Sequence, residues 1–188
     1  MLPDAVTAIA LIASIAGAAF AGANMGYAFQ NMVIVDGFAT FFRIICLSVG
    51  LLTMFVSGGY LDREGAAKGE YYALMLFSLV GQSLMCAANE LVMIFIGIEI
   101  SSIATYIMAG YLKDDRRNNE SALKYFLLGS FATAFLLYGV AWIYGLTGTT
   151  NIDSVRQALL NNLPNLPMPL VGAAAGLMFV GFAFKVSA

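Results

Sequence analysis

Glu99, Lys124 and Lys185 are charged side chains inside apolar stretches of this sequence, where they could do chemistry. Glu99 is the only carboxylate between Leu91 and Leu112, a run that is long enough to cross a bilayer as a helix. A charged group at the centre of a membrane costs roughly 2.5 to 3.5 kcal/mol on insertion scales, so it needs a partner or a wet path. A helix that carries such a group is a candidate for moving protons or ions.

Lys185 is the second candidate, because it lies deep in the last apolar segment. It stands about fifteen residues from the start of that segment, which is roughly 22 Å at helical rise. A buried carboxylate and a buried ammonium that lie close together titrate as one unit and can pass a proton without a cofactor. A purely structural ion pair would use the same two residues. Ser102 and Tyr106 share the helix face of Glu99, three and seven residues on, and make that face polar.

Lys124 is the third, and its spacing alone favours a simpler interpretation. Glu120 precedes it by four residues at the start of an apolar segment. Such an i,i+4 pair at the beginning of a helix contributes only about 0.2 to 0.5 kcal/mol and needs no function.

The composition predicts an integral membrane protein. Of 188 residues, 61% are hydrophobic and only 11% are charged, and the mean hydropathy is +0.84. The apolar runs are too long and unbroken for a membrane barrel. There is no histidine, which excludes histidine-based metal sites and bases, and a net charge of −2 gives no basic patch for nucleic acid. Cys46 and Cys86 lie in apolar runs and are interpreted as small core residues rather than a disulfide or cluster.

The fold class is therefore predicted to be all-α, a polytopic transmembrane helix bundle that forms one domain over residues 1–188. No basic segment precedes the first apolar run, so that run is expected to stay in the membrane rather than be cleaved. Six segments carry the bundle, the third of them only just long enough to span: Ala5 to Ala23, Phe38 to Tyr60, Tyr71 to Ala88, Leu91 to Tyr111, Ser121 to Tyr144, and Leu170 to the end.

The longest loop, 147–169, is predicted to lie outside the membrane and to contain a short amphipathic helix. Ile152, Val155, Leu159 and Leu163 fall within it at helical spacing. The segments on either side of Asn89 and Glu90 should form a tight antiparallel hairpin, because only these two residues join them.

The loop charges predict the orientation. If every segment crosses the membrane, the loops on one side carry five positive residues: Arg63, Lys68, Lys113, Arg116 and Arg117. The loops on the other side carry Arg156 alone. Because positive loops lie in the cytoplasm, the first side and the N-terminus are predicted to be cytoplasmic. Arg43 lies inside its segment near the opposite face, and it can either snorkel outward or face a polar interior. The last segment stops at Ala188, shortly after Lys185, so the chain is expected to be a fragment of a longer one.

Three stretches of the sequence resemble subunit N of bacterial NADH–quinone oxidoreductase, respiratory complex I, and are similar to mitochondrial NADH dehydrogenase subunit 2. The resemblance runs from about residue 35 to the end. The segment Ala5 to Ala23 resembles the second helix of the family more weakly. The first helix of the family is therefore expected to be missing from this chain. The three stretches read LFSLVGQSLMCAANELVMIFIGIEISSIATYIMAGY, NNESALKYFLLGSFATAFLLYGVAWIYGLTGTTN and GLMFVGFAFKVSA.

The resemblance implies an antiporter-like, proton-translocating subunit with about fourteen helices and two inverted repeats. Glu99 falls on the membrane glutamate of the fifth helix of the family, and Lys185 falls on its ion-pair partner in the broken seventh helix. Lys124 falls on a further lysine of the hydrophilic axis in the sixth helix. This carry-over replaces the simpler interpretation of Lys124. It implies that Glu99 tunes the charge state of Lys185 and that Lys124 passes protons onward.

The resemblance also implies the setting: a bacterial inner membrane, with quinone reduction elsewhere in the complex. This chain has no Gly-rich dinucleotide motif and no cysteine cluster, so NADH, FMN, the iron–sulfur clusters and quinone are expected in other subunits. Expected partners are other membrane subunits, including a second antiporter-like subunit and a small helical subunit. Two alternatives stay open: a subunit of a multi-subunit cation/proton antiporter or membrane hydrogenase, and a structural spacer that carries no protons.

Overall fold

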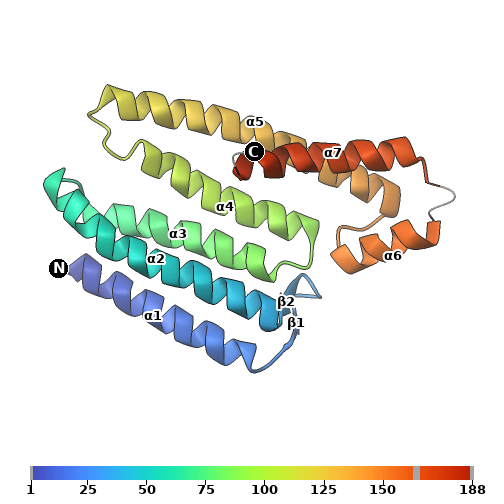
Figure 1. Cartoon of the computed structure of the whole chain (residues 1–188), viewed down its shortest axis with the longest axis horizontal. Helices are drawn as coiled ribbons and strands as arrows, with labels where there is room; N and C mark the ends of the chain where they lie inside the picture. Colours follow the sequence, from blue (N-terminus) through green and yellow to red (C-terminus); the bar gives the residue numbers. More distant parts are fainter. Residues whose placement is uncertain (1, 163–165, 187–188) are drawn as a thin grey trace.

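The computed structural model describes residues 2–162 and 166–186, and these form seven helices and one short β-hairpin (Figure 1). Leu163 of the predicted amphipathic helix and the last two residues of the GLMFVGFAFKVSA motif lie outside the described residues. The elements are α1 (Leu2–Gly22), β1 (Gly26–Ala28), β2 (Val33–Val35), α2 (Gly37–Arg63), α3 (Lys68–Ala87), α4 (Leu91–Ala109), α5 (Arg116–Thr147), α6 (Ile152–Asn162) and α7 (Met168–Lys185).

The predicted all-α membrane bundle is confirmed. Five of the helices in the described part of the chain are long and apolar enough to cross a membrane: α1, α2, α4, α5 and α7. The third predicted segment forms α3, but this helix is not among the five. Its first turn carries Lys68 and Glu70, which leave a shorter apolar stretch than in its neighbours. It nevertheless packs between α2 and α4 along the bundle (Figure 1).

Local signals set where the long helices begin and end. The Asp36 carboxylate accepts a hydrogen bond from the Ala39 backbone amide at 2.7 Å and caps the start of α2. Asp115 caps α5 in the same way. Gly148, with φ +74°, ends α5 in the left-handed conformation that glycine adopts without strain.

Helices α1 to α5 pack in sequence order, each antiparallel to the one before, and α7 returns along α5 (Figure 1). Glycines allow the closest approaches. A Cβ added to Gly81 of α3 would lie 2.5 Å from the Gly97 carbonyl oxygen of α4. A Cβ on Gly139 of α5 would lie 2.8 Å from the Ala174 carbonyl oxygen of α7. These two contacts hold α4 and α7, the helices that carry Glu99 and Lys185, firmly in the bundle.

Three connections meet at one end of the bundle, which we call the hairpin end: the β1–β2 hairpin, the α3–α4 turn at Ala88–Glu90, and the α5–α6 link at Thr149–Asn151. The Asn89 backbone amide donates to the Met32 carbonyl at 2.8 Å, and the Asn89 carbonyl accepts from the Ile152 amide at 3.1 Å. The Leu91 amide donates to the Thr150 carbonyl at 2.9 Å. Three segments far apart in the sequence are thereby fastened together.

The opposite end, where the chain begins, is fastened by side chains. Lys68 lies 2.8 Å from the Asp62 carboxylate and 3.7 Å from that of Asp4. The buried Tyr72 hydroxyl donates to Asp4 at 2.9 Å. These contacts join α1, α2 and α3 above a shared apolar core that contains Leu11, Leu47, Met54, Leu61, Met75 and Leu79.

Candidate functional site

One face of α4 carries three polar side chains at helical spacing: Glu99, Ser102 and Tyr106. Ser102 and Tyr106 are buried, with 7% and 5% of their surface exposed. The Glu99 Oε1 atom is also buried, and it has no hydrogen-bond partner. A buried carboxylate oxygen without a partner is costly, so a structure retains one only where something else depends on it.

Lys185 comes to this face from the end of α7. Its ammonium donates to the Ser102 hydroxyl oxygen at 2.7 Å and to the Tyr106 hydroxyl oxygen at 3.0 Å. It also lies 5.4 Å from the centre of the Tyr106 ring. Lys185, the last residue of α7, lies beside the middle of α4 (Figure 1).

The ion pair between Glu99 and Lys185 that the family resemblance implies is not formed in this structure. No salt bridge within 4.0 Å joins the two side chains, both of which lie in the described part of the chain. The physical reason is that Lys185 bonds Ser102 and Tyr106, one and two turns along α4 from Glu99. The structure therefore brings both predicted residues to the same helix face but leaves the carboxylate and the ammonium apart.

Tyr106 is positioned by α5. Its ring packs edge-on against Tyr125, with ring centres 4.6 Å apart, and against Phe126 at 5.9 Å. Its hydroxyl lies so close to Gly129 that a Cβ there would overlap the oxygen. The α4 face with Ser102 and Tyr106 was predicted from the sequence, but the role of Gly129 was not, since nothing in the sequence pairs it with a residue 23 positions earlier.

A cavity of about 350 Å³ adjoins the Lys185 ammonium among α3, α4, α5 and α7. Its polar lining comes from Ser101, Ser102, Thr105 and Tyr125. The space and the hydroxyl groups are sufficient to hold several water molecules, each of which needs two to four polar partners. This arrangement can connect the half-buried Lys185 ammonium to a chain of hydrogen-bonding groups.

Lys124 lies apart from this site. Its ammonium contacts the Glu120 carboxylate at 2.6 Å in an i,i+4 pair, and the two side chains are 70% and 62% exposed. This is the geometry that the spacing of the two residues predicts. The structure therefore does not bring Lys124 together with Glu99 and Lys185.

The site as a whole can hold and release a proton but offers little else. It combines a carboxylate, an ammonium and hydroxyl groups inside an apolar bundle. No group of three or more potential metal ligands among His, Cys, Asp and Glu occurs within residues 2–162 and 166–186. The functional groups present are those of proton transfer.

Comparison with known proteins gives consistent results. Residues 88–188 match the family model described as NADH:quinone oxidoreductase/Mrp antiporter, transmembrane. NADH-quinone oxidoreductase subunit N 1 of Solibacter usitatus is 57% identical over 183 residues, which is 97% of this chain and 37% of that protein. The chain thus spans just over a third of the length of this relative.

Two solved structures resemble the fold. A chain of respiratory complex I from Thermus thermophilus with bound aureothin superposes with a TM-score of 0.77 at 29% identity, covering 97% of this chain and 38% of that one. A chain of the membrane-bound sulfane sulfur reductase, an archaeal respiratory membrane complex, gives a TM-score of 0.80 at 25% identity, covering 96% and 38%.

The family model includes Glu99, Lys124 and Lys185, and the relative carries the name that the sequence motifs indicate. The resemblance to subunit N is therefore confirmed, and this multi-pass membrane chain belongs to the NADH:quinone oxidoreductase/Mrp antiporter transmembrane family.

Proposed function

We propose that this chain is part of an antiporter-like membrane subunit of NADH–quinone oxidoreductase that carries protons across the membrane, driven by quinone reduction in other subunits. The observation that supports it most is the α4 face shared by Glu99 and Lys185. A buried carboxylate oxygen without a partner lies on the same helix face as the hydroxyls that hold a half-buried ammonium. Neither charge is neutralised by the other.

In this proposal Glu99 tunes the charge state of Lys185, and Lys185 exchanges a proton with the adjoining polar cavity. When Lys185 leaves Ser102 and Tyr106 and approaches Glu99, the carboxylate stabilises the charged ammonium. When it returns, that stabilisation is lost and the proton is released more easily. Lys124 passes protons onward from the cytoplasmic side, a role that its sequence position supports and that its exposed pair with Glu120 leaves accessible.

The proposed setting is the bacterial inner membrane, with the N-terminus of this chain in the cytoplasm, as the loop charges indicate. Residues 1–188 form one transmembrane domain, and loop 147–169, which contains α6, lies outside the membrane on the opposite face. The partners are other membrane subunits, including a second antiporter-like subunit and a small helical subunit. NADH, FMN, iron–sulfur clusters and quinone belong to other subunits.

The proposal is tested by replacing Lys185 in the full-length subunit within its assembled complex. We expect Lys185→Gln to lower the number of protons translocated per NADH oxidised, while the complex still assembles. Lys113→Gln, which removes an equal charge from the α4–α5 loop, is the control and should leave the yield unchanged. A normal proton yield in Lys185→Gln would refute a carrier role for this lysine.

A second candidate is a subunit of a multi-subunit cation/proton antiporter. The description of the matching family covers both groups, which is the observation in its favour. The two differ in their partners, so purification of the native complex discriminates between them. If quinone-reducing activity is recovered together with the subunit, the subunit belongs to NADH–quinone oxidoreductase. If the recovered complex exchanges cations for protons and has no quinone-reducing activity, the subunit belongs to a cation/proton antiporter.

A structural spacer has less support. As a spacer, the subunit would use Glu99 and Lys185 as a fixed ion pair, and no such pair lies within 4.0 Å in this structure.

A further inference from the structure

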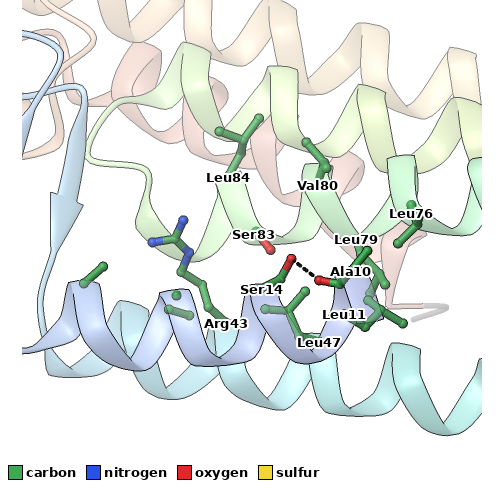
Figure 2. Close-up of a pocket in the computed structure, with 13 residues that line it drawn as sticks. Ala10, Leu11, Ser14, Arg43, Leu47, Leu76, Leu79, Val80, Ser83 and Leu84 are labelled. Carbon is green, nitrogen blue, oxygen red and sulfur yellow. Dashed lines mark hydrogen bonds between the residues drawn. The ribbon is translucent and has the colours of Figure 1, made fainter. Parts of the chain in front are cut away.

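Arg43 of α2 is a charged residue inside the bundle that the proposed proton path does not use. Within residues 2–162 and 166–186, its guanidinium makes no hydrogen bond or ion pair. It stands six residues after Gly37, the first residue of α2, which is about 9 Å from the hairpin end at helical rise. Figure 2 shows the guanidinium pointing into a groove, with no dashed line to any neighbour.

The groove has a volume of about 580 Å³ and runs between α1, α2 and α3 (Figure 2). Small residues of α1 form one wall and leucines of α2 and α3 form the other, so the lining is mainly aliphatic. Its polar groups besides Arg43 are Ser14, whose hydroxyl already donates to the Ala10 carbonyl at 2.8 Å, and Ser83. An apolar groove with one unpaired cation matches an amphipathic anion, whose apolar part fits the lining and whose charge pairs with Arg43.

The length of the groove matches one leaflet of a membrane. On α1 it extends from Ala10 to Ala21, which is roughly 16 Å at 1.5 Å per residue. Half of a hydrocarbon core is about 15 Å thick. Arg43 lies toward the hairpin end of the groove, and the aliphatic lining continues from there toward the middle of the bundle (Figure 2).

The aliphatic lining and the single cation of the groove favour a narrow apolar occupant with an anionic end. A lipid acyl chain is much narrower than a helix. A phosphate group offers the oxygen pair that a guanidinium binds in a bidentate manner.

We propose that this groove is a binding site for an anionic phospholipid, with the phosphate on Arg43 and one acyl chain between α1, α2 and α3. The lipid supplies the counter-charge that Arg43 lacks and covers the aliphatic wall of the groove. Phosphatidylglycerol fits this description. Phosphatidylcholine carries a cation of its own that competes with Arg43, so it binds more weakly. The inference requires only a membrane location and does not depend on proton transport.

The test measures lipid binding to the full-length protein, delipidated in detergent and titrated with phosphatidylglycerol or phosphatidylcholine, by native mass spectrometry. We expect the wild type to bind phosphatidylglycerol at least tenfold more tightly than phosphatidylcholine. Arg43→Gln abolishes this preference, whereas Arg43→Lys keeps most of it. Arg63→Gln, a matched loss of charge at the other end of α2, leaves binding unchanged.

A second variant fills the groove without touching its charge. Gly17 has no atom within 4 Å of an added Cβ, so the side chain of Gly17→Leu enters open space and displaces the acyl chain. We expect at least tenfold weaker phosphatidylglycerol binding. Gly176→Leu, at an equally open glycine on α7, is its control. Equal binding of the two lipids by the wild type, or undiminished phosphatidylglycerol binding in both Arg43→Gln and Gly17→Leu, would overturn the proposal.

Discussion

At the scale of single residues, the central feature is that Lys185 has three possible partners on one helix. Ser102 and Tyr106 hold its ammonium in this structure, and Glu99 lies one turn beyond Ser102 with a buried oxygen that has no partner. A hydrogen bond to a charged group contributes about 1.5 to 3 kcal/mol, which is enough to decide where the ammonium lies. The hydroxyls and the carboxylate therefore compete for one cation.

This competition predicts the effect of removing one hydroxyl. In Tyr106→Phe, the Lys185 ammonium loses an acceptor whose hydrogen bond contributes about 1.5 to 3 kcal/mol. The equilibrium constant between its position at Ser102 and a position at Glu99 then changes by roughly ten- to a hundredfold in favour of Glu99. We expect proton translocation by the assembled complex to slow. The check is the translocation rate at a fixed pH.

Tyr138→Phe is the matched control, since Tyr138 lies on the exposed side of α5 away from Lys185. If Tyr106→Phe and Tyr138→Phe behave alike, the hydroxyl does not position Lys185.

At the scale of elements, the site depends on how closely α5 approaches α4. Gly129 leaves room for the Tyr106 hydroxyl, and the edge-on contact with Tyr125 fixes the ring. The sequence predicted the five helices that are long and apolar enough to cross a membrane and the polar face of α4, because both follow from hydropathy and helical period. The place of Gly129 could not be predicted, since it depends on the packing of two helices rather than on a pattern within one.

This packing predicts that Gly129→Ala is destabilising. The added methyl group overlaps the Tyr106 hydroxyl, and overpacking of this kind costs about 1 to 3 kcal/mol. Gly145→Ala on the same helix has no atom within 4 Å of its added Cβ, and it should be neutral or stabilising by up to about 1 kcal/mol. Thermal unfolding in detergent compares the two variants. Equal unfolding temperatures would contradict the close approach at Gly129.

At the scale of the whole molecule, the hairpin end joins the two halves of the chain. Asn89 contacts the β-hairpin before it and the α5–α6 link after it. The α5–α6 link was expected to be part of a loop, and the β-hairpin was not predicted at all. Its strands have only three residues each and are held by partners elsewhere in the chain, so no local sequence pattern predicts them.

The hydrogen bonds of Asn89 at the hairpin end predict that Asn89→Ala lowers the local protection of backbone amides against hydrogen exchange. The side-chain amide of Asn89 donates to the Asn31 carbonyl at 3.2 Å, and its removal costs about 1 to 3 kcal/mol. We expect faster hydrogen exchange at the Leu91 and Ile152 amides, which cross between the joined segments. Asn24→Ala, at an exposed position, is the control and should leave both exchange rates unchanged. Equal exchange rates in the two variants would show that the contacts at the hairpin end do not depend on the Asn89 side chain.

The most direct test of the account is the proton yield of the assembled complex with Glu99→Gln, measured beside Glu99→Asp. Gln keeps the size of the side chain but cannot become charged, whereas Asp keeps the carboxylate. The account predicts that Glu99→Gln lowers the number of protons translocated per NADH oxidised with assembly intact, and that Glu99→Asp retains more of it. A normal yield in Glu99→Gln would contradict the central claim that this carboxylate takes part in carrying protons.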